Sequence, residues 1–215
     1  MVYVIAALLG VSGWLIALVT RALFTWAVTA RYTRKYGTPE RLAQVRAPVD
    51  AILGGVVDEP IRFGALWWMI AVTASGAFTL TQTSAPDNPI VLGLFFALGW
   101  ALAEIVHLLA VVTAAARTSD ETMRQHFKAS GLTDAKSVAL RILAALLRNA
   151  GLTLILIALP ILVLVTLTAR AAAALLAVRK LVNTVTEKPQ NTLLTSGLLA
   201  AIVFAVAGGV LAAIS

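Results

Sequence analysis

The chain has no cysteine and only two histidines among its 215 residues. The absence of cysteine excludes a disulfide framework, thiolate metal sites and thiol catalysis. Two histidines, His107 and His126, are too few for a polyhistidine metal centre or a multi-haem centre within this one chain. No glycine-rich phosphate loop and no Ser-His-acid set are found. We therefore expect no catalytic residues, no metal site and no enzyme that acts alone, and the sequence names no cofactor.

Charged residues are also scarce. They make up 13% of the chain, whereas soluble domains carry roughly 25%. Hydrophobic residues make up 60%, and the mean hydropathy is +0.92. A soluble core of this size could not bury so much apolar surface, but a lipid bilayer removes the need to bury it. The composition therefore predicts an integral membrane protein whose main partner is the lipid bilayer.

The few charges leave five long apolar runs. A helix needs about 20 apolar residues to cross a bilayer, and none of the runs alternates as a membrane β-strand does. Backbone groups in lipid must bond within their own segment, so the runs are expected to be helices. We predict an all-α fold, with residues 1–215 forming a single transmembrane domain of about five spanning helices and short loops. The approximate ranges of these helices are residues 2–30, 63–83, 90–116, 149–169 and 193–214.

Basic residues outnumber acidic residues by 17 to 10, which gives a formal net charge of +7. They lie between the apolar runs instead of forming one patch, so the positive-inside rule explains them and no nucleic-acid partner is expected. Linkers 31–62 and 117–148 each hold six Lys or Arg residues, and residues 84–89 hold none. This distribution predicts that both basic linkers are cytoplasmic and that the N-terminus is outside.

The linker at residues 170–192 does not fit this pattern. It carries four basic residues on the side that simple counting assigns to the outside. Either the fourth run spans and continues as an outer interfacial helix, or it is a re-entrant segment bent near Pro160, which leaves four spans. We favour the spanning interpretation, because a proline in a membrane helix usually kinks the helix without reversing it.

The cytoplasmic linkers are expected to form amphipathic helices. In linker 117–148, Ser137, Arg141 and Arg148 share one face of a basic helix that leads into the fourth run. This helix either lies in the inner headgroup layer or docks a cytoplasmic partner through Arg141 and Arg148. The linker is therefore a candidate site for a cytoplasmic partner.

Three ionisable residues, Arg21, Glu104 and His107, interrupt the apolar runs. A charge near the centre of a membrane helix costs roughly 2.5–3.5 kcal/mol, so such a residue usually faces protein or water. Glu104 and His107 are three residues apart and share a helix face. Arg21 and His107 each lie about 15 Å from the inner end of their helix. We predict that Arg21 pairs with Glu104, with His107 nearby.

This intramembrane polar group has three possible roles. It could fix the register of two helices as a structural ion pair, form a proton or ion path through Glu104 and His107, or contact a polar group on another subunit. A single Glu-x-x-His pair without further membrane carboxylates rules out a di-iron site in this chain. His107 could also ligate haem or chlorin in a cofactor-holding protein.

Uncharged polar residues make the second run the least lipid-like. Thr73, Ser75 and Thr79 could line a polar path through the membrane. Alternatively, they bond to the backbone of their own helix or to a neighbouring helix, as such residues commonly do.

The last run carries small residues at four-residue spacing. A stripe of this kind lets helix backbones approach closely, either within the chain or between copies of it. Its members are Gly197, Ala201, Ala205 and Gly209.

Two functions fit these features about equally. The first is a membrane transport or translocation component, such as a permease-like subunit or a small channel. The alternative is a non-catalytic polytopic subunit of a respiratory, photosynthetic, oxidase or secretion complex. Either would place the chain in a homo- or hetero-oligomer with other membrane subunits.

Overall fold

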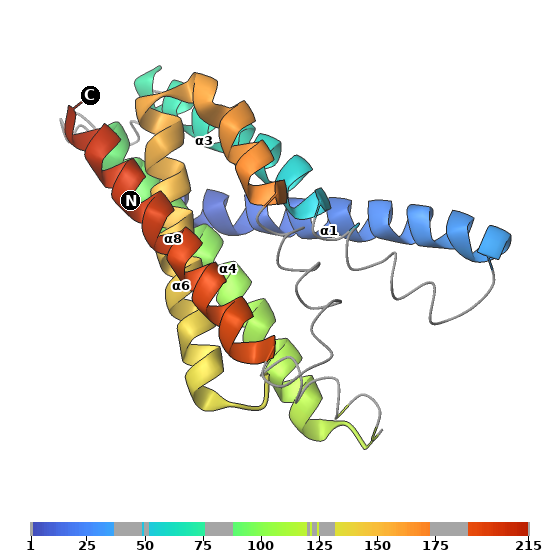
Figure 1. Ribbon diagram of the computed structural model, residues 1–215. Helices are drawn as coiled ribbons and strands as arrows, with labels where there is room; N and C mark the ends of the chain where they lie inside the picture. The colour runs from blue at the N-terminus through green and yellow to red at the C-terminus, as the bar shows by residue number, and fades with distance from the viewer. Residues whose placement is uncertain are drawn as a thin grey trace.

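The described part of the chain is entirely helical in its regular elements. The computed structural model describes residues 2–36, 49, 52–75, 88–119, 121, 124, 132–172 and 189–214. The elements are α1 (Val2–Tyr36), α3 (Asp58–Ala74), α4 (Pro89–Arg117), α6 (Ala135–Ala158), η1 (Pro160–Leu162) and α8 (Pro189–Ile214). Residues 52–56 and 163–172 are also helical. Figure 1 shows α4, α6 and α8 side by side, with α1 crossing them and extending beyond the bundle.

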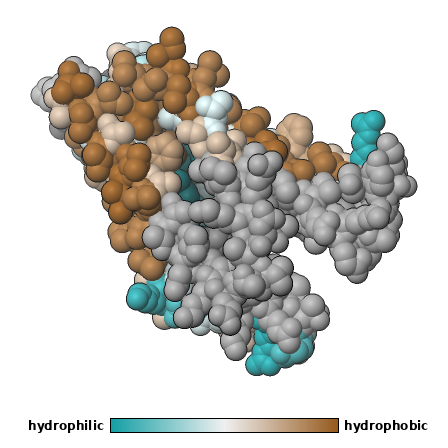
Figure 2. All heavy atoms as spheres, in the orientation of Figure 1, coloured by the Kyte–Doolittle hydropathy of each residue, from teal (hydrophilic) through white to brown (hydrophobic). Residues whose placement is uncertain are grey.

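Three of these helices are long and apolar enough to cross a membrane: Val2–Arg31, Pro89–Arg117 and Ala135–Ala158. Shorter apolar helices cover Pro160–Ala172 and Leu198–Ile214. Much of the apolar surface faces outward, as Figure 2 shows for the face over α8. An outward apolar surface suits contact with lipid, and together with three candidate spans it indicates an integral multi-pass membrane protein.

Local sequence signals set the ends of two of these helices. The side chain of Asn88 accepts a 2.9 Å hydrogen bond from the Ile90 backbone N–H at the start of α4, and Pro89 fits the first helical position. At the start of α6, the carboxylate of Asp134 accepts a 2.8 Å bond from the backbone N–H of Ser137. These caps satisfy donors that the first helical turn would otherwise leave unpaired.

The fourth predicted span, residues 149–169, differs from the structure in where its helix begins and ends and in its direction after Pro160. The helix begins at Ala135, inside the predicted linker 117–148, and ends at Ala158. Leu159 leaves the helical region with φ −140° and ψ 84°, because the ring of Pro160 cannot follow a helical residue without a clash. After η1 the chain turns back, and residues 163–172 run beside α3 (Figure 1). We call residues 163–172 the return arm.

Backbone contact confirms that the chain reverses at Pro160. A Cβ atom on Gly55 would lie 2.9 Å from the carbonyl oxygen of Leu167 and 3.0 Å from the Cβ of Ala171. A helix continuing straight through Pro160 would instead carry Arg170 about 30 Å beyond Asn149. The expectation that Pro160 kinks the fourth run without reversing it is therefore wrong, because the chain turns back there. The helix before the bend, Ala135–Ala158, is by itself long and apolar enough to cross a membrane.

The second predicted span is shifted toward the N-terminus. α3 begins at Asp58, within the predicted linker 31–62, so its first turn carries acidic residues that favour a helix N-terminus. The predicted continuation to residue 83 falls mostly outside the described residues. Predicted spans 2–30 and 90–116 agree closely with α1 and α4.

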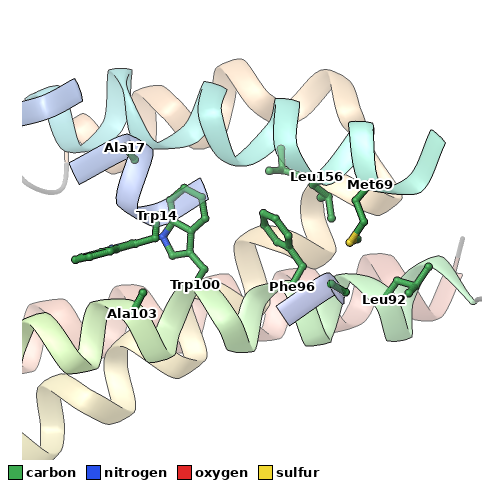
Figure 3. Close-up of a cluster of buried hydrophobic side chains, with 10 residues drawn as sticks. Trp14, Ala17, Met69, Leu92, Phe96, Trp100, Ala103 and Leu156 are labelled. Atoms are coloured by element: carbon green, nitrogen blue, oxygen red, sulfur yellow. The ribbon is translucent and has the colours of Figure 1, made fainter. Parts of the chain in front are cut away.

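An apolar core joins α1, α3, α4 and α6. In Figure 3 the rings of Phe96 and Trp100 project from α4 toward α3, beside Trp14 of α1 and Leu156 of α6. Met69 of α3 completes the buried set. This core lies against the charged residues of α3, because the guanidinium of Arg62 stacks over the Trp100 ring at 4.6 Å from its centroid.

Glycines let the helix backbones touch at two crossings. A Cβ on Gly99 of α4 would lie 1.9 Å from the carbonyl oxygen of Ala7 in α1. A Cβ on Gly151 of α6 would lie 2.3 Å from the carbonyl group of Phe204 in α8. Neither position has room for a side chain, so both contacts depend on glycine.

Candidate functional site

The first five residues of α3 include three charged side chains that lie in the interior. Asp58, Glu59 and Arg62 are all buried, and Arg62 is completely inaccessible. Glu59 and Arg62 are three residues apart on one helix face, with 3.9 Å between the Arg62 Nε and a Glu59 carboxylate oxygen. Buried charges are costly unless they are paired, so these side chains require partners from other helices.

The return arm supplies one partner. The guanidinium of Arg170 donates a 2.8 Å hydrogen bond to Asp58 and a second one to Glu59. One planar guanidinium thus holds two adjacent carboxylates, each through a different terminal nitrogen. This pairing fixes the return arm to α3.

α6 supplies the next partner. Arg62 donates a 2.5 Å hydrogen bond to the side-chain oxygen of Asn149, which is also fully buried. The amide nitrogen of Asn149 in turn donates a 3.0 Å bond to Glu104 of α4. Asn149 therefore connects the charges of α3 to those of α4.

Arg148 completes the connection by donating a hydrogen bond to the other carboxylate oxygen of Glu104. The side chains of Arg148 and Glu104 are each about a quarter exposed. At the opposite end, Arg21 of α1 lies 3.4 Å from Asp58. Charged groups of α1, α3, α4, α6 and the return arm thus form one continuous set. We call it the charged cluster, consisting of Arg21, Asp58, Glu59, Arg62, Glu104, Arg148 and Arg170.

Several polar atoms of this cluster have no hydrogen-bond partner among the described residues. They include Oδ1 of Asp58, Oε2 of Glu59, and Nε and one terminal nitrogen of Arg62. Donors and acceptors of this kind, close together and inaccessible, are the usual surroundings of internal water.

The chemistry available to the cluster is electrostatic. Arginine keeps its proton in proteins, so it cannot pass protons between neighbouring carboxylates, and arginines separate the carboxylate of Glu104 from those of α3. Among the described residues, no group of three or more His, Asp or Glu side chains could hold a metal ion. The cluster can bind charge, fix helix positions and exchange ion-pair partners.

The predicted pair of Arg21 and Glu104 is wrong in its partners. Arg21 bonds to Asp58, and Glu104 bonds to Arg148 and Asn149. We predicted the pair because Arg21 and Glu104 lie at similar depths when each is counted along its own helix. Each residue has a nearer partner, Asp58 for Arg21 and Arg148 for Glu104. Both partners come from segments that we had assigned to linkers. Both residues still belong to the charged cluster.

His107 does not join the cluster. Its side chain is exposed and lies against Trp14 of α1, with ring centroids 5.5 Å apart and the planes tilted by 54°. No hydrogen bond links it to Glu104 in the part of the chain that the structure describes. A proton or ion path through Glu104 and His107 gains no support from these contacts.

The predicted polar path in the second run is described in part. The Thr73 hydroxyl donates a 2.8 Å bond to the Met69 carbonyl, and the Ser75 hydroxyl donates a 2.8 Å bond to the Val72 carbonyl. Both therefore bond to the backbone of their own helix. Thr79 lies outside the described residues.

The predicted docking residues point to different environments. Arg148 faces inward and is engaged by Glu104, so it is not available to a cytoplasmic partner. Arg141, two turns earlier in α6, is half-buried. The docking face that we expected on this helix is therefore not a uniform basic surface.

The small-residue stripe of α8 is used partly within the chain. Ala201 is buried, and Ala205 contacts Gly151 of α6. A Cβ on Gly209 would meet no atom within 4 Å, whereas Gly208, outside the predicted stripe, packs on the Gly151 backbone. The side-chain surroundings of Gly197 are outside the described residues.

Sequence reasoning missed Asp58, Glu59, Arg62, Asn149 and Arg170 as site residues. Two signals were present. Glu59 and Arg62 have the spacing of a helical ion pair, and Asn149 and Arg170 lie at nearly equal distances on either side of Pro160. The second signal has meaning only once the chain is known to reverse there.

The chain was compared with known proteins, and no protein-family model, no curated protein and no solved structure matched it.

Proposed function

We propose that this protein is a membrane transport or translocation component, such as a permease-like subunit or a small channel. The observation that supports this most is the charged cluster between apolar helices. Replacing buried ion pairs with apolar residues is often neutral or stabilising, so a bundle that needed only stability would gain little from seven charged residues. Ionisable groups inside a membrane commonly mark the path or the moving parts of a transporter.

The reversal at Pro160 supports the same proposal. Broken membrane helices are common at the substrate sites of transporters, where the ends of half-helices and freed backbone groups face the transported species. Here the return arm, which follows the break, carries Arg170 back to Asp58 and Glu59. The break and the cluster are thus parts of one arrangement, and exchange of the Arg170 ion pairs would let the return arm move.

The proposed topology has the residues between α1 and α3, and those between α4 and α6, on the cytoplasmic side and the N-terminus outside. About five membrane segments are proposed, of which α6 and the return arm form a re-entrant pair. α6 and α8 run in parallel in Figure 1, so their starts, Ala135 and Pro189, lie at the same end of the bundle. The proposed topology therefore has α8 begin on the same side as α6, as the positive-inside rule favours for a helix that follows a basic stretch of sequence.

The proposal is tested with purified protein in liposomes, using dye assays for proton, potassium and chloride flux. We expect flux above that of protein-free vesicles. Glu104→Gln should lower it, because Arg148 loses its counter-charge and the cluster rearranges. Gly64→Ala is the matched control, since the space around Gly64 is open. Equal leakage from protein-free, native and Glu104→Gln vesicles would contradict a channel or carrier.

A non-catalytic subunit of a larger membrane complex is the second candidate. It is favoured by the part of α1 that follows Arg21, where Leu23, Phe24 and Trp26 are exposed and the helix leaves the bundle (Figure 1). Purification from native membranes in mild detergent, followed by mass spectrometry, separates the two candidates. Stoichiometric membrane partners without flux would favour the subunit, and a homo-oligomer with flux would favour the transporter.

A further inference from the structure

The charges of the cluster do not balance. It contains four guanidinium groups, on Arg21, Arg62, Arg148 and Arg170, and three carboxylates, on Asp58, Glu59 and Glu104. One positive charge is therefore uncompensated within the described residues. An unpaired charge among apolar helices is unfavourable, so an anion from outside this set is required.

The uncompensated charge is shared by Arg21 and Arg62, since Arg62 lies 3.9 Å from Glu59. Arg62 is fully buried, so Arg21 is the one of the two that an anion from outside the chain can reach. Arg148 has Glu104 to itself, and Arg170 bonds both carboxylates of α3. Arg21 shares one oxygen of Asp58 with Arg170, at 3.4 Å against 2.8 Å for Arg170. Among the arginines that pair with a carboxylate on another helix, which are Arg21, Arg148 and Arg170, Arg21 therefore has the weakest ion pair.

Arg21 is also at the margin of the bundle. Its side chain is 27% exposed, whereas that of Arg62 is fully buried. Before Arg21, α1 buries Trp14 and Ala17 in the core, and after it most side chains are exposed. The guanidinium of Arg21 is thus partly accessible at the surface of the bundle.

The side chains that follow are suited to a phospholipid. Leu23 and Phe24 offer an apolar surface for acyl chains, and Trp26, which is 70% exposed, is of the residue type that prefers the level of the headgroups. Arg21 precedes Trp26 by five residues, which is about 7.5 Å along α1. An arginine side chain can then extend toward the headgroup layer.

We infer that Arg21 binds the phosphate of an anionic phospholipid at the point where α1 leaves the bundle. The phosphodiester supplies the missing negative charge, and guanidinium and phosphate can form paired hydrogen bonds. A lipid with a net negative charge is preferred over a zwitterionic one, whose own cation competes with Arg21. This inference does not depend on the proposed transport function.

Native mass spectrometry of the purified full chain, titrated with phosphatidylglycerol or phosphatidylcholine, tests this inference. We expect the native protein to retain phosphatidylglycerol in preference to phosphatidylcholine. Arg21→Gln should weaken phosphatidylglycerol binding about fivefold, the factor expected for one basic residue at an anionic surface. Arg21→Lys should keep most of the binding. Arg124→Gln, whose side chain already pairs with Glu121 outside the cluster, should leave it unchanged.

Three outcomes would overturn the inference. The first is equal phosphatidylglycerol binding by native protein and Arg21→Gln. The second is displacement of the lipid by the same concentration of inorganic phosphate, which would make this a site for free anions. The third is a lower oligomer mass in Arg21→Gln with unchanged lipid content, which would assign the counter-charge to a second copy of the chain. Thermal unfolding of each variant shows whether it is folded. If Arg21→Gln is unfolded, the lipid preference of the native protein decides the test, and equal retention of phosphatidylglycerol and phosphatidylcholine would overturn the inference.

Discussion

Arg170 donates a 2.8 Å hydrogen bond to Asp58, a residue 112 positions earlier in the chain. The side chain of Asp58 is 4% exposed and that of Arg170 is 15% exposed, so little water screens the pair. The bond joins the return arm to the start of α3. The position of the return arm therefore depends on an ion pair as well as on apolar packing.

We expect Arg170→Gln to lower the free energy of unfolding by about 3–5 kcal/mol, because it leaves Asp58 and Glu59 buried without their main counter-charge. Reversible unfolding in detergent measures this change. Arg124→Gln breaks the exposed pair with Glu121 and is the control. It should leave the unfolding midpoint unchanged, as surface ion pairs contribute little. Equal effects of the two variants would contradict the buried role of Arg170.

Gly99→Ala and Gly64→Ala should change stability in opposite directions. A Cβ at position 99 collides with the backbone of α1, and overpacking of this kind costs about 1–3 kcal/mol. At position 64 there is open space, so alanine should stabilise the helix by about 0.5–1 kcal/mol. Thermal unfolding of both variants compares them directly. A neutral Gly99→Ala variant would show that α1 and α4 are not in backbone contact.

Gly151→Leu and Gly209→Leu test how α8 is held. The side chain at position 151 would displace Phe204, so we expect Gly151→Leu to separate α6 from α8 and lower the unfolding midpoint. Gly209→Leu meets no neighbour in the chain and should leave the midpoint unchanged. Size-exclusion chromatography of Gly209→Leu adds a further test. A change in its oligomeric state would assign that glycine to contacts between copies.

Asp134 gives the start of α6 a dependence on pH. Hydrogen bonds from the Ser137 hydroxyl and backbone N–H hold the pKa of Asp134 below its ordinary value of 3.8. Its folded pKa is thus lower than its unfolded pKa. The carboxylate therefore stabilises the fold above the unfolded pKa, and this contribution is lost as the pH falls through the folded pKa.

The variant Asp134→Asn isolates this contribution, because asparagine still caps a helix but does not titrate. We expect native protein to unfold at a higher temperature than Asp134→Asn at pH 7. The difference should shrink as the pH falls below the ordinary pKa of aspartate. A difference that stays constant between pH 7 and pH 3 would show that the ionised carboxylate makes no contribution.

Composition and hydropathy predicted the helical membrane class, and they placed α1 and α4 within a few residues. Both helices are apolar on all sides, so a single uninterrupted run defines each of them. Composition and hydropathy did not predict where α3 and α6 begin, because polar residues occupy the first part of each helix. Asp58, Glu59 and Arg148 looked like linker residues because a hydropathy scale scores a charge as exposed, whether or not another helix neutralises it.

The cluster could be predicted only in part for the same reason. Arg21 and Glu104 stood out because apolar residues surround them in sequence. Their partners depend on which helix faces meet, and that depends on the reversal at Pro160. A proline is compatible with either a kink or a reversal of the chain. The reversal is stabilised by contacts between residues far apart in sequence, those of Arg170 with Asp58 and of Gly55 with Ala171.

The central claim is that the chain reverses at Pro160 and packs the return arm against residues 52–59. A disulfide between cysteines introduced at Gly55 and Ala171 tests it most directly. The native chain has no cysteine, so no other thiol can react. A Cβ on Gly55 would lie 3.0 Å from that of Ala171, and disulfides need about 3.5–4.5 Å, which a small shift provides. We expect rapid oxidation within one chain in membranes, and none for the control pair Gly64→Cys with Ala171→Cys. Failure of the first pair to oxidise, or equal oxidation of both pairs, would contradict the reversal.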